Sequence, residues 1–192
     1  MLAPISSQAR IGESRHGLES RLLRSSGIVY RDDAIEANRR RGMPYLQYLP
    51  YIENSVDVRI YFKTADGRKP TSSEMEERRM ADGWDLHVVY VGGKSAIEVY
   101  KRSRGITDYE MNELLARQAG GAYWTRKEKP KEGEEVPPSA FGYEMVRSDG
   151  AIRAKRLGGD SLLFVQSDID AELATMKESD LIEQAPISAE GF

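Results

Sequence analysis

The chain has 192 residues, of which 40% are hydrophobic and 31% are charged, which is typical of a globular protein with one sizeable core. It contains no cysteine, so disulfides, thiolate metal sites and cysteine nucleophiles are excluded. The net charge is −3, and residues 160–192 carry one lysine against eight acidic side chains. We therefore expect no nucleic-acid partner, and no apolar run approaches the roughly 20 residues that cross a bilayer.

The first part of the chain predicts two short helices within residues 6–23, because leucines recur at helical spacing and glycines interrupt the pattern. Residues 28–30 predict a short strand, and residues 32–41 predict a polar helix or loop. Residues 43–52 carry tyrosines three positions apart and prolines at positions 44 and 50, which favours an extended or polyproline-like segment over the core. We expect those tyrosines to serve packing.

Residues 84–102 predict a β-hairpin, because two strands with alternating apolar residues meet at Gly92-Gly93. A two-residue turn there fixes which side chains lie opposite each other. The predicted opposite pairs are Val88 with Ile97, Leu86 with Val99, His87 with Glu98, and Asp85 with Tyr100. Residues 56–63 alternate in the same way and predict a neighbouring strand. One face is thus apolar and the other polar.

Residues 106–121 predict one central amphipathic helix, with Thr107 and Glu110 at the spacing of a capping box. Residues 127–138 are charged and rich in proline, which predicts a flexible insertion. Further strands follow, with hairpin turns expected at Asp149-Gly150 and at Gly158-Gly159. The second of these turns would place Ala154 opposite Leu163 and Ile152 opposite Val165.

We expect an α+β protein with short N-terminal helices and an antiparallel β-meander. Residues 1–170 would form a single domain. Residues 168–177 predict a helix, and residues 171–192 predict an acidic, partly disordered C-terminal tail.

Several segments occur in an order that resembles a group of uncharacterised bacterial proteins usually made with signal peptides. They are SSQARIG, YVGGKSAIEVYKR, ITDYEMNELLARQAGGAYW, MVRSDGAIRAKRL and SLLFV. A helical start before an antiparallel meander also resembles the fold of small outer-membrane lipoproteins and of β-lactamase-inhibitor protein. The resemblance implies a periplasmic or secreted protein. Residues 1–10 lack the pattern of an export signal, and no cysteine is present for a lipid anchor.

The sequence offers few candidates for catalysis. His16 and His87 are the only histidines, and neither has the neighbours of a metal site. The glycine pairs lack phosphate-loop spacing, so we expect no metal and no cofactor. His87 opposite Glu98 could act as an acid–base pair, although an ordinary polar pair between strands has the same pattern. A deep pocket beside these two residues would favour an enzyme.

We therefore predict a non-catalytic binding or assembly module, whose partner we expect to be another protein. Its working surface would be the polar sheet face, because tyrosine and arginine are enriched at interaction hot spots. The residues of this predicted face are Arg59, Tyr61, Asp85, His87, Glu98 and Tyr100. The alternative is a small-ligand hydrolase that uses His87 and Glu98.

Overall fold

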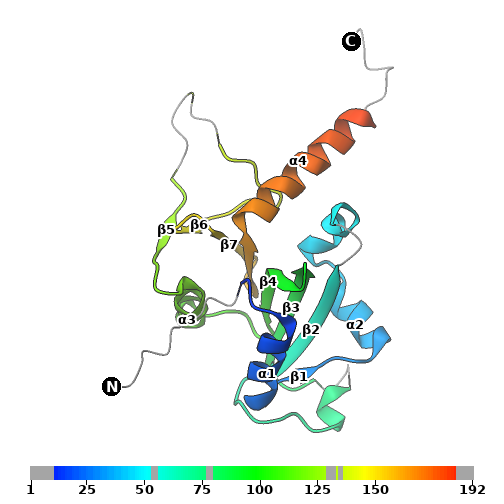
Figure 1. Cartoon of the computed structure of the whole chain (residues 1–192). Helices are drawn as coiled ribbons and strands as arrows, with labels where there is room; N and C mark the ends of the chain where they lie inside the picture. The colour runs from blue at the N-terminus through cyan, green and yellow to red at the C-terminus, as the bar shows by residue number, and fades with distance from the viewer. Residues whose placement is uncertain (1–10, 53–55, 77–79, 129–132, 134–135, 185–192) are drawn as a thin grey trace.

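A computed structural model describes residues 11–52, 56–76, 80–128, 133 and 136–184. These residues form helices packed on one eight-stranded antiparallel sheet, so the predicted α+β class is confirmed (Figure 1). The strand order is β1-β2-β3-β4-β8-β7-β6-β5. Residues 1–10 and 185–192, and half of the predicted insertion at 127–138, lie outside the described residues.

The strands are short at both edges of the sheet and long in the middle. They are β1 (Ile28–Val29), β2 (Asp57–Thr64), β3 (Gly83–Val91), β4 (Lys94–Arg102), β5 (Trp124–Arg126), β6 (Met145–Arg147), β7 (Ile152–Leu157) and β8 (Ser161–Gln166). The helices are α1 (Arg15–Arg24), α2 (Asp33–Arg40), α3 (Asp108–Ala119) and α4 (Ser167–Glu183), with 3₁₀ helices η1 (Pro44–Tyr51) and η2 (Ser73–Met75).

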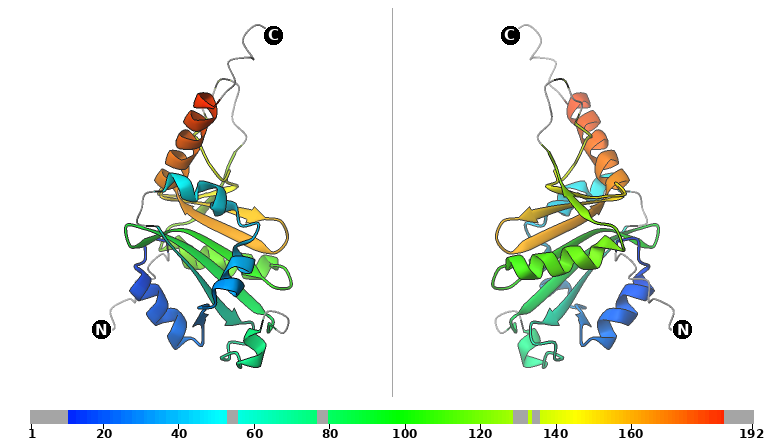
Figure 2. Two further views of the ribbon diagram at one scale, coloured as in Figure 1. Left: turned by 90° about the vertical axis from the view of Figure 1, so that its right-hand side faces the viewer. Right: turned by 90° about the vertical axis from the view of Figure 1, so that its left-hand side faces the viewer.

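Helices cover both faces of the sheet (Figure 2). On the first face, leucines of α1 and α3 pack against alternate residues of β2, β3, β4 and β8. On the second face, tyrosines of η1 and Leu173 of α4 pack against the intervening residues. Alternate side chains of a strand point to opposite faces, and here each face meets an apolar layer. The central strands are consequently buried on both sides.

A bulge changes the pairing within the hairpin of β3 and β4. Gly92 and Gly93 connect the strands with φ of 57° and 76°, a backbone that glycine adopts without strain. Tyr90 pairs with Ser95, but Val89 pairs with Ile97, so Ala96 is the extra residue of the bulge. Every pair farther from the turn is shifted by one position.

The predicted register of this hairpin is therefore wrong beyond the bulge. His87 pairs with Val99, and Glu98 pairs with Val88. Because side chains alternate along a strand, His87 points to the second face and Glu98 to the first. The predicted pair of His87 and Glu98 does not form.

The loop between β7 and β8 is one residue longer than predicted. β7 ends at Leu157 and β8 begins at Ser161, which leaves a loop of residues 158–160 in place of the expected two-residue turn. Ala154 consequently pairs with Phe164, whereas Leu163 was expected. At the turn containing Asp149-Gly150, Met145 pairs with Ala154.

Two helical segments also differ from expectation. Pro44–Tyr51 is a 3₁₀ helix where an extended segment was predicted. A 3₁₀ helix has three residues per turn, so tyrosines three positions apart share one side of it. α4 continues to Glu183, so the first part of the predicted tail at 171–192 is helical.

Gly83 occupies a position where the backbones of β2 and β3 leave no room for a side chain. A Cβ there would lie 2.6 Å from Cζ of Phe62 and in closer conflict with the Lys63 carbonyl oxygen. We expect Gly83→Ala to lower the free energy of unfolding by about 1–3 kcal/mol, because overpacking shifts both strands. Urea denaturation of the variant and the original chain measures this difference in the free energy of unfolding. Gly159→Ala is the control, since a Cβ there meets nothing within 4 Å, and equal effects of the two variants would contradict the prediction.

Candidate functional site: a groove between two helices

The six residues of the predicted polar face do not share one surface. Arg59, Tyr61, Glu98 and Tyr100 belong to the first face of the sheet, whereas Asp85 and His87 belong to the second. Glu98 is 0% exposed, and Tyr61 and His87 are each 1% exposed. The prediction of one exposed polar sheet face is wrong for three reasons. The bulge moves Glu98 and Tyr100 to the face opposite His87. The pairing of β2 with β3 places Arg59 and Tyr61 on that face too, and helices cover both faces.

His87 is a buried, neutral side chain. Its Nδ1 lies 2.9 Å from the hydroxyl of Tyr45, and its Nε2 has no hydrogen-bond partner among the described residues. Desolvation is the main cause that lowers the pKa of His87 to about 3, and the nearby cations Lys101, Arg39 and Arg40 contribute to the same shift. The imidazole packs beneath η1 and does not reach solvent.

Asp85, on the same face, holds α2 against the sheet. Its carboxylate accepts hydrogen bonds from Arg39 at 2.8 Å and from the Tyr30 hydroxyl at 3.3 Å. Burial raises the pKa of Asp85, while Arg39 acts in the opposite direction. These contacts give Asp85 a structural role.

Glu98 lies at the centre of a buried network on the first face. Its Oε2 accepts hydrogen bonds from the Tyr100 hydroxyl at 2.7 Å and from Nε2 of Gln118 at 2.8 Å. Oε1 of Gln118 in turn accepts from the backbone amide of Ile11 at 3.1 Å. These hydrogen bonds fix the position of the Tyr100 hydroxyl.

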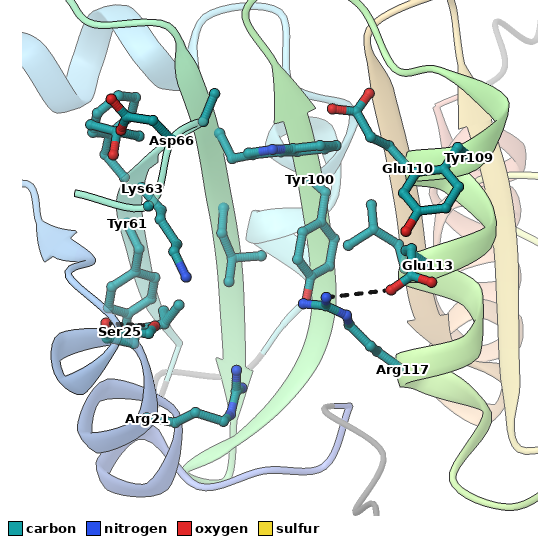
Figure 3. A pocket seen from close by; sticks show the side chains of 18 residues that line it. Arg21, Ser25, Tyr61, Lys63, Asp66, Tyr100, Tyr109, Glu110, Glu113 and Arg117 are labelled. Atoms are coloured by element: carbon teal, nitrogen blue, oxygen red, sulfur yellow. Dashed lines mark hydrogen bonds and ion pairs between the residues drawn. The ribbon is translucent and has the colours of Figure 1, made fainter. Parts of the chain in front are cut away.

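A groove of about 560 Å³ opens on the first face, between α1 and α3 and across β2, β3 and β4 (Figure 3). The strand register explains its floor. Lys63 pairs with Trp84, and in the next row Tyr61, Leu86 and Tyr100 lie side by side. Neither His87 nor Glu98 lines this groove.

The floor of the groove is held rigidly by hydrogen bonds and ring contacts. The Tyr61 hydroxyl lies 3.0 Å from that of Tyr90 and 3.2 Å from the Glu19 carboxylate. Burial raises the pKa of Tyr61, which keeps its hydroxyl protonated at neutral pH. The guanidinium of Arg102 lies 5.5 Å from the centre of the Trp84 ring.

Charged side chains of both signs line the walls. The cations are Arg21, Lys63 and Arg117, and the anions are Asp66, Glu110 and Glu113. Figure 3 shows the three cations reaching toward the middle of the groove, while Asp66 and Glu110 lie at one end. The hydrogen bond from the Thr107 amide is the largest of the causes that lower the pKa of Glu110.

Sequence reasoning missed the groove as a site. It named Tyr61 and Tyr100, but it did not single out Trp84, Arg21 or Arg117. The alternation of Trp84 and Leu86 along one strand was a usable signal. Arg21 and Arg117 are far apart in sequence and lie on different helices, so only the packing of α1 and α3 brings them to one groove.

The described ranges contain no cluster of three or more histidine or acidic side chains arranged to hold a metal ion. Within the same ranges, no helix combines the length and apolar character of a membrane span.

Searches against protein-family models, curated proteins and solved structures found no match to this chain.

Proposed function

We propose that this chain is a non-catalytic binding protein that holds a small ligand in the groove between α1 and α3. The groove itself carries the proposal. Its volume of about 560 Å³ falls in the range of small-molecule sites, which are concave and combine apolar surface with a few polar groups. Trp84, Leu86 and Tyr100 supply the apolar surface.

The geometry of the predicted residues favours this proposal over the two functions expected from sequence. A docking surface on the polar sheet face requires exposed side chains, and five of the six predicted residues are buried. The hydrolase alternative requires His87 and Glu98 together, and these residues belong to opposite faces. A partner protein and export to the periplasm stay predictions, and the second rests on the resemblance alone.

Trp84 provides a reporter for the test. The chain has two tryptophans, so Trp124→Phe leaves Trp84 as the only one. We expect the neutral fluorescent probe N-phenyl-1-naphthylamine to bind at a single site and to change Trp84 emission, because Trp84 lines the groove. Probe fluorescence is also measured with the unaltered chain, in case the substitution disturbs the fold.

Two single variants, one in α1 and one at its C-terminal cap, test whether the probe binds in the groove. Ser25 lines the groove, and Ser25→Leu should weaken binding about tenfold by narrowing it. Ser20→Leu makes the same chemical change outside the groove and should have little effect. Equal effects of the two leucine variants would refute the proposal, and so would Trp84 emission that neither this probe nor its anionic analogue 8-anilinonaphthalene-1-sulfonate changes.

A further inference from the structure

We infer that the ligand of this groove is an amphiphilic anion, whose acidic group lies among Arg21, Lys63 and Arg117 while its apolar body lies on Trp84, Leu86 and Tyr100. This inference rests on the proposed function, since it names the chemical class of the ligand for the same groove. It depends on the positions of the three cations, on the internal pairing of the acidic residues, and on the apolar floor between them.

The three cations come from three different elements and converge on one region. Arg21 belongs to α1, Lys63 to β2 and Arg117 to α3, and Figure 3 shows all three reaching inward. The side chains come from opposite walls and from the floor of the groove, and we expect an acidic group bound between them to contact all three. A carboxylate, sulfonate or phosphate group accepts several charge-assisted hydrogen bonds in this way.

Both arginines retain donor capacity for a ligand. A guanidinium has five N–H donors in a planar fork. Among the described residues, Arg21 donates to Glu13 at 2.6 Å and Arg117 donates to Glu113 at 3.5 Å. The second contact is long, and both of its side chains are about half exposed, so it holds Arg117 weakly.

The acidic residues at the other end of the groove are neutralised by arginines of the chain itself. Asp66 accepts from Nε of Arg68 at 3.0 Å. Glu110 accepts from Nε of Arg102 at 3.1 Å and from the Thr107 amide at 2.9 Å. These carboxylates already have cationic partners, so a cationic ligand would compete with them. Arg21 and Arg117 each use one N–H donor on a glutamate, so each guanidinium keeps donors for an acidic group of a ligand.

The apolar floor gives such a ligand an orientation. Leu86 is flanked by Tyr61 and Tyr100 in one row, and Trp84 lies two residues farther along β3, beside Lys63. Aromatic rings bury large areas and favour stacking with a flat apolar group. A ring system carrying one acidic group would place the ring over Leu86 and Trp84 and the acid among the three cations.

Two probes that differ by one charged group test this inference on the full chain. They are 8-anilinonaphthalene-1-sulfonate and its neutral analogue N-phenyl-1-naphthylamine. We expect the sulfonate to bind at least tenfold more tightly at low ionic strength. Arg21→Met, Lys63→Met and Arg117→Met should each weaken sulfonate binding about three- to tenfold and leave the neutral probe unaffected, because each removes one partly exposed charge contact.

Arg24→Met is the matched control, since Arg24 is an exposed arginine of α1 that does not line the groove. Circular dichroism and thermal melting of each variant check that the fold is intact. If both probes bind in the groove with equal affinity, or if the three variants act no more strongly than Arg24→Met, the anion inference is refuted and the proposed function stands. If neither probe changes Trp84 emission, the proposed function fails and the inference fails with it.

Discussion

Asp170→Ala should lower the free energy of unfolding by about 3–5 kcal/mol, because it leaves a buried arginine without its partner. Asp170 is 0% exposed, and its carboxylate accepts from Arg153 at 2.8 Å and from the Phe141 amide at 3.1 Å. Arg153 lies on β7 and is itself 7% exposed. The ion pair joins α4 and the segment before β6 to the sheet. Urea denaturation followed by circular dichroism measures the loss.

Asp168→Ala is the control for this prediction, because Asp168 is an exposed residue in the first turn of the same helix. It should cost less than about 1 kcal/mol. The double variant Arg153→Met with Asp170→Ala should cost less than the sum of the two single variants, since neither charge is then left buried alone. An Asp170→Ala variant as stable as the Asp168→Ala variant would contradict the assignment of this pair.

Stability should fall steeply as the pH drops below the ordinary pKa of histidine, owing to His87. Its pKa is about 3 in the folded chain and about 6.5 in an unfolded chain. Between these values the unfolded state binds a proton that the folded state does not, so stability decreases as pH falls. The difference of about 3.5 units at 1.36 kcal/mol each gives a loss of about 4–5 kcal/mol by pH 3.

His87→Gln removes the titrating imidazole. The free energy of unfolding should then depend less on pH between pH 6.5 and 3, and the remaining slope should come from the carboxylates. His16→Gln is the control, because His16 is the other histidine of the chain and is exposed on α1. Free energies of unfolding at several pH values make the comparison. If the His87→Gln variant keeps the full slope of the original chain, His87 is not the group responsible.

Features that depend on residues close together in sequence could be predicted well. Thr107 accepts from the Glu110 amide, and Glu110 accepts from the Thr107 amide, as their spacing indicates. The alternation of β2 and β3 likewise specifies strands, and the α+β class follows from such local patterns.

The residue pairs between neighbouring strands could not be predicted as accurately. A bulge adds one residue to a strand without changing its composition, and Ala96 carries no mark in the sequence that distinguishes it from a regular strand residue. That one residue moved Glu98 and Tyr100 to the face opposite His87. The predicted working surface failed for this reason, and also because the pairing of β2 with β3 places Arg59 and Tyr61 on the face opposite His87.

The period of three between Tyr45, Tyr48 and Tyr51 had two physical explanations. Polyproline and 3₁₀ helices both repeat every three residues, and the flanking prolines fit either one. Contact with the sheet distinguishes them, since Tyr45 and Tyr48 are buried and Tyr45 reaches His87. The groove was beyond local reasoning as well, because it forms only where α1 and α3 leave part of the sheet uncovered.

The strand order has a consequence for how the chain could associate with others. The edge strands β1 and β5 have only two and three residues, so each offers few backbone groups to a further strand. Where β2 extends past β1, the Val58 carbonyl accepts from Arg40 and the Ile60 carbonyl accepts from the Tyr30 amide. This protection disfavours domain swapping, amyloid-like stacking and the capture of an extended peptide as a ninth strand.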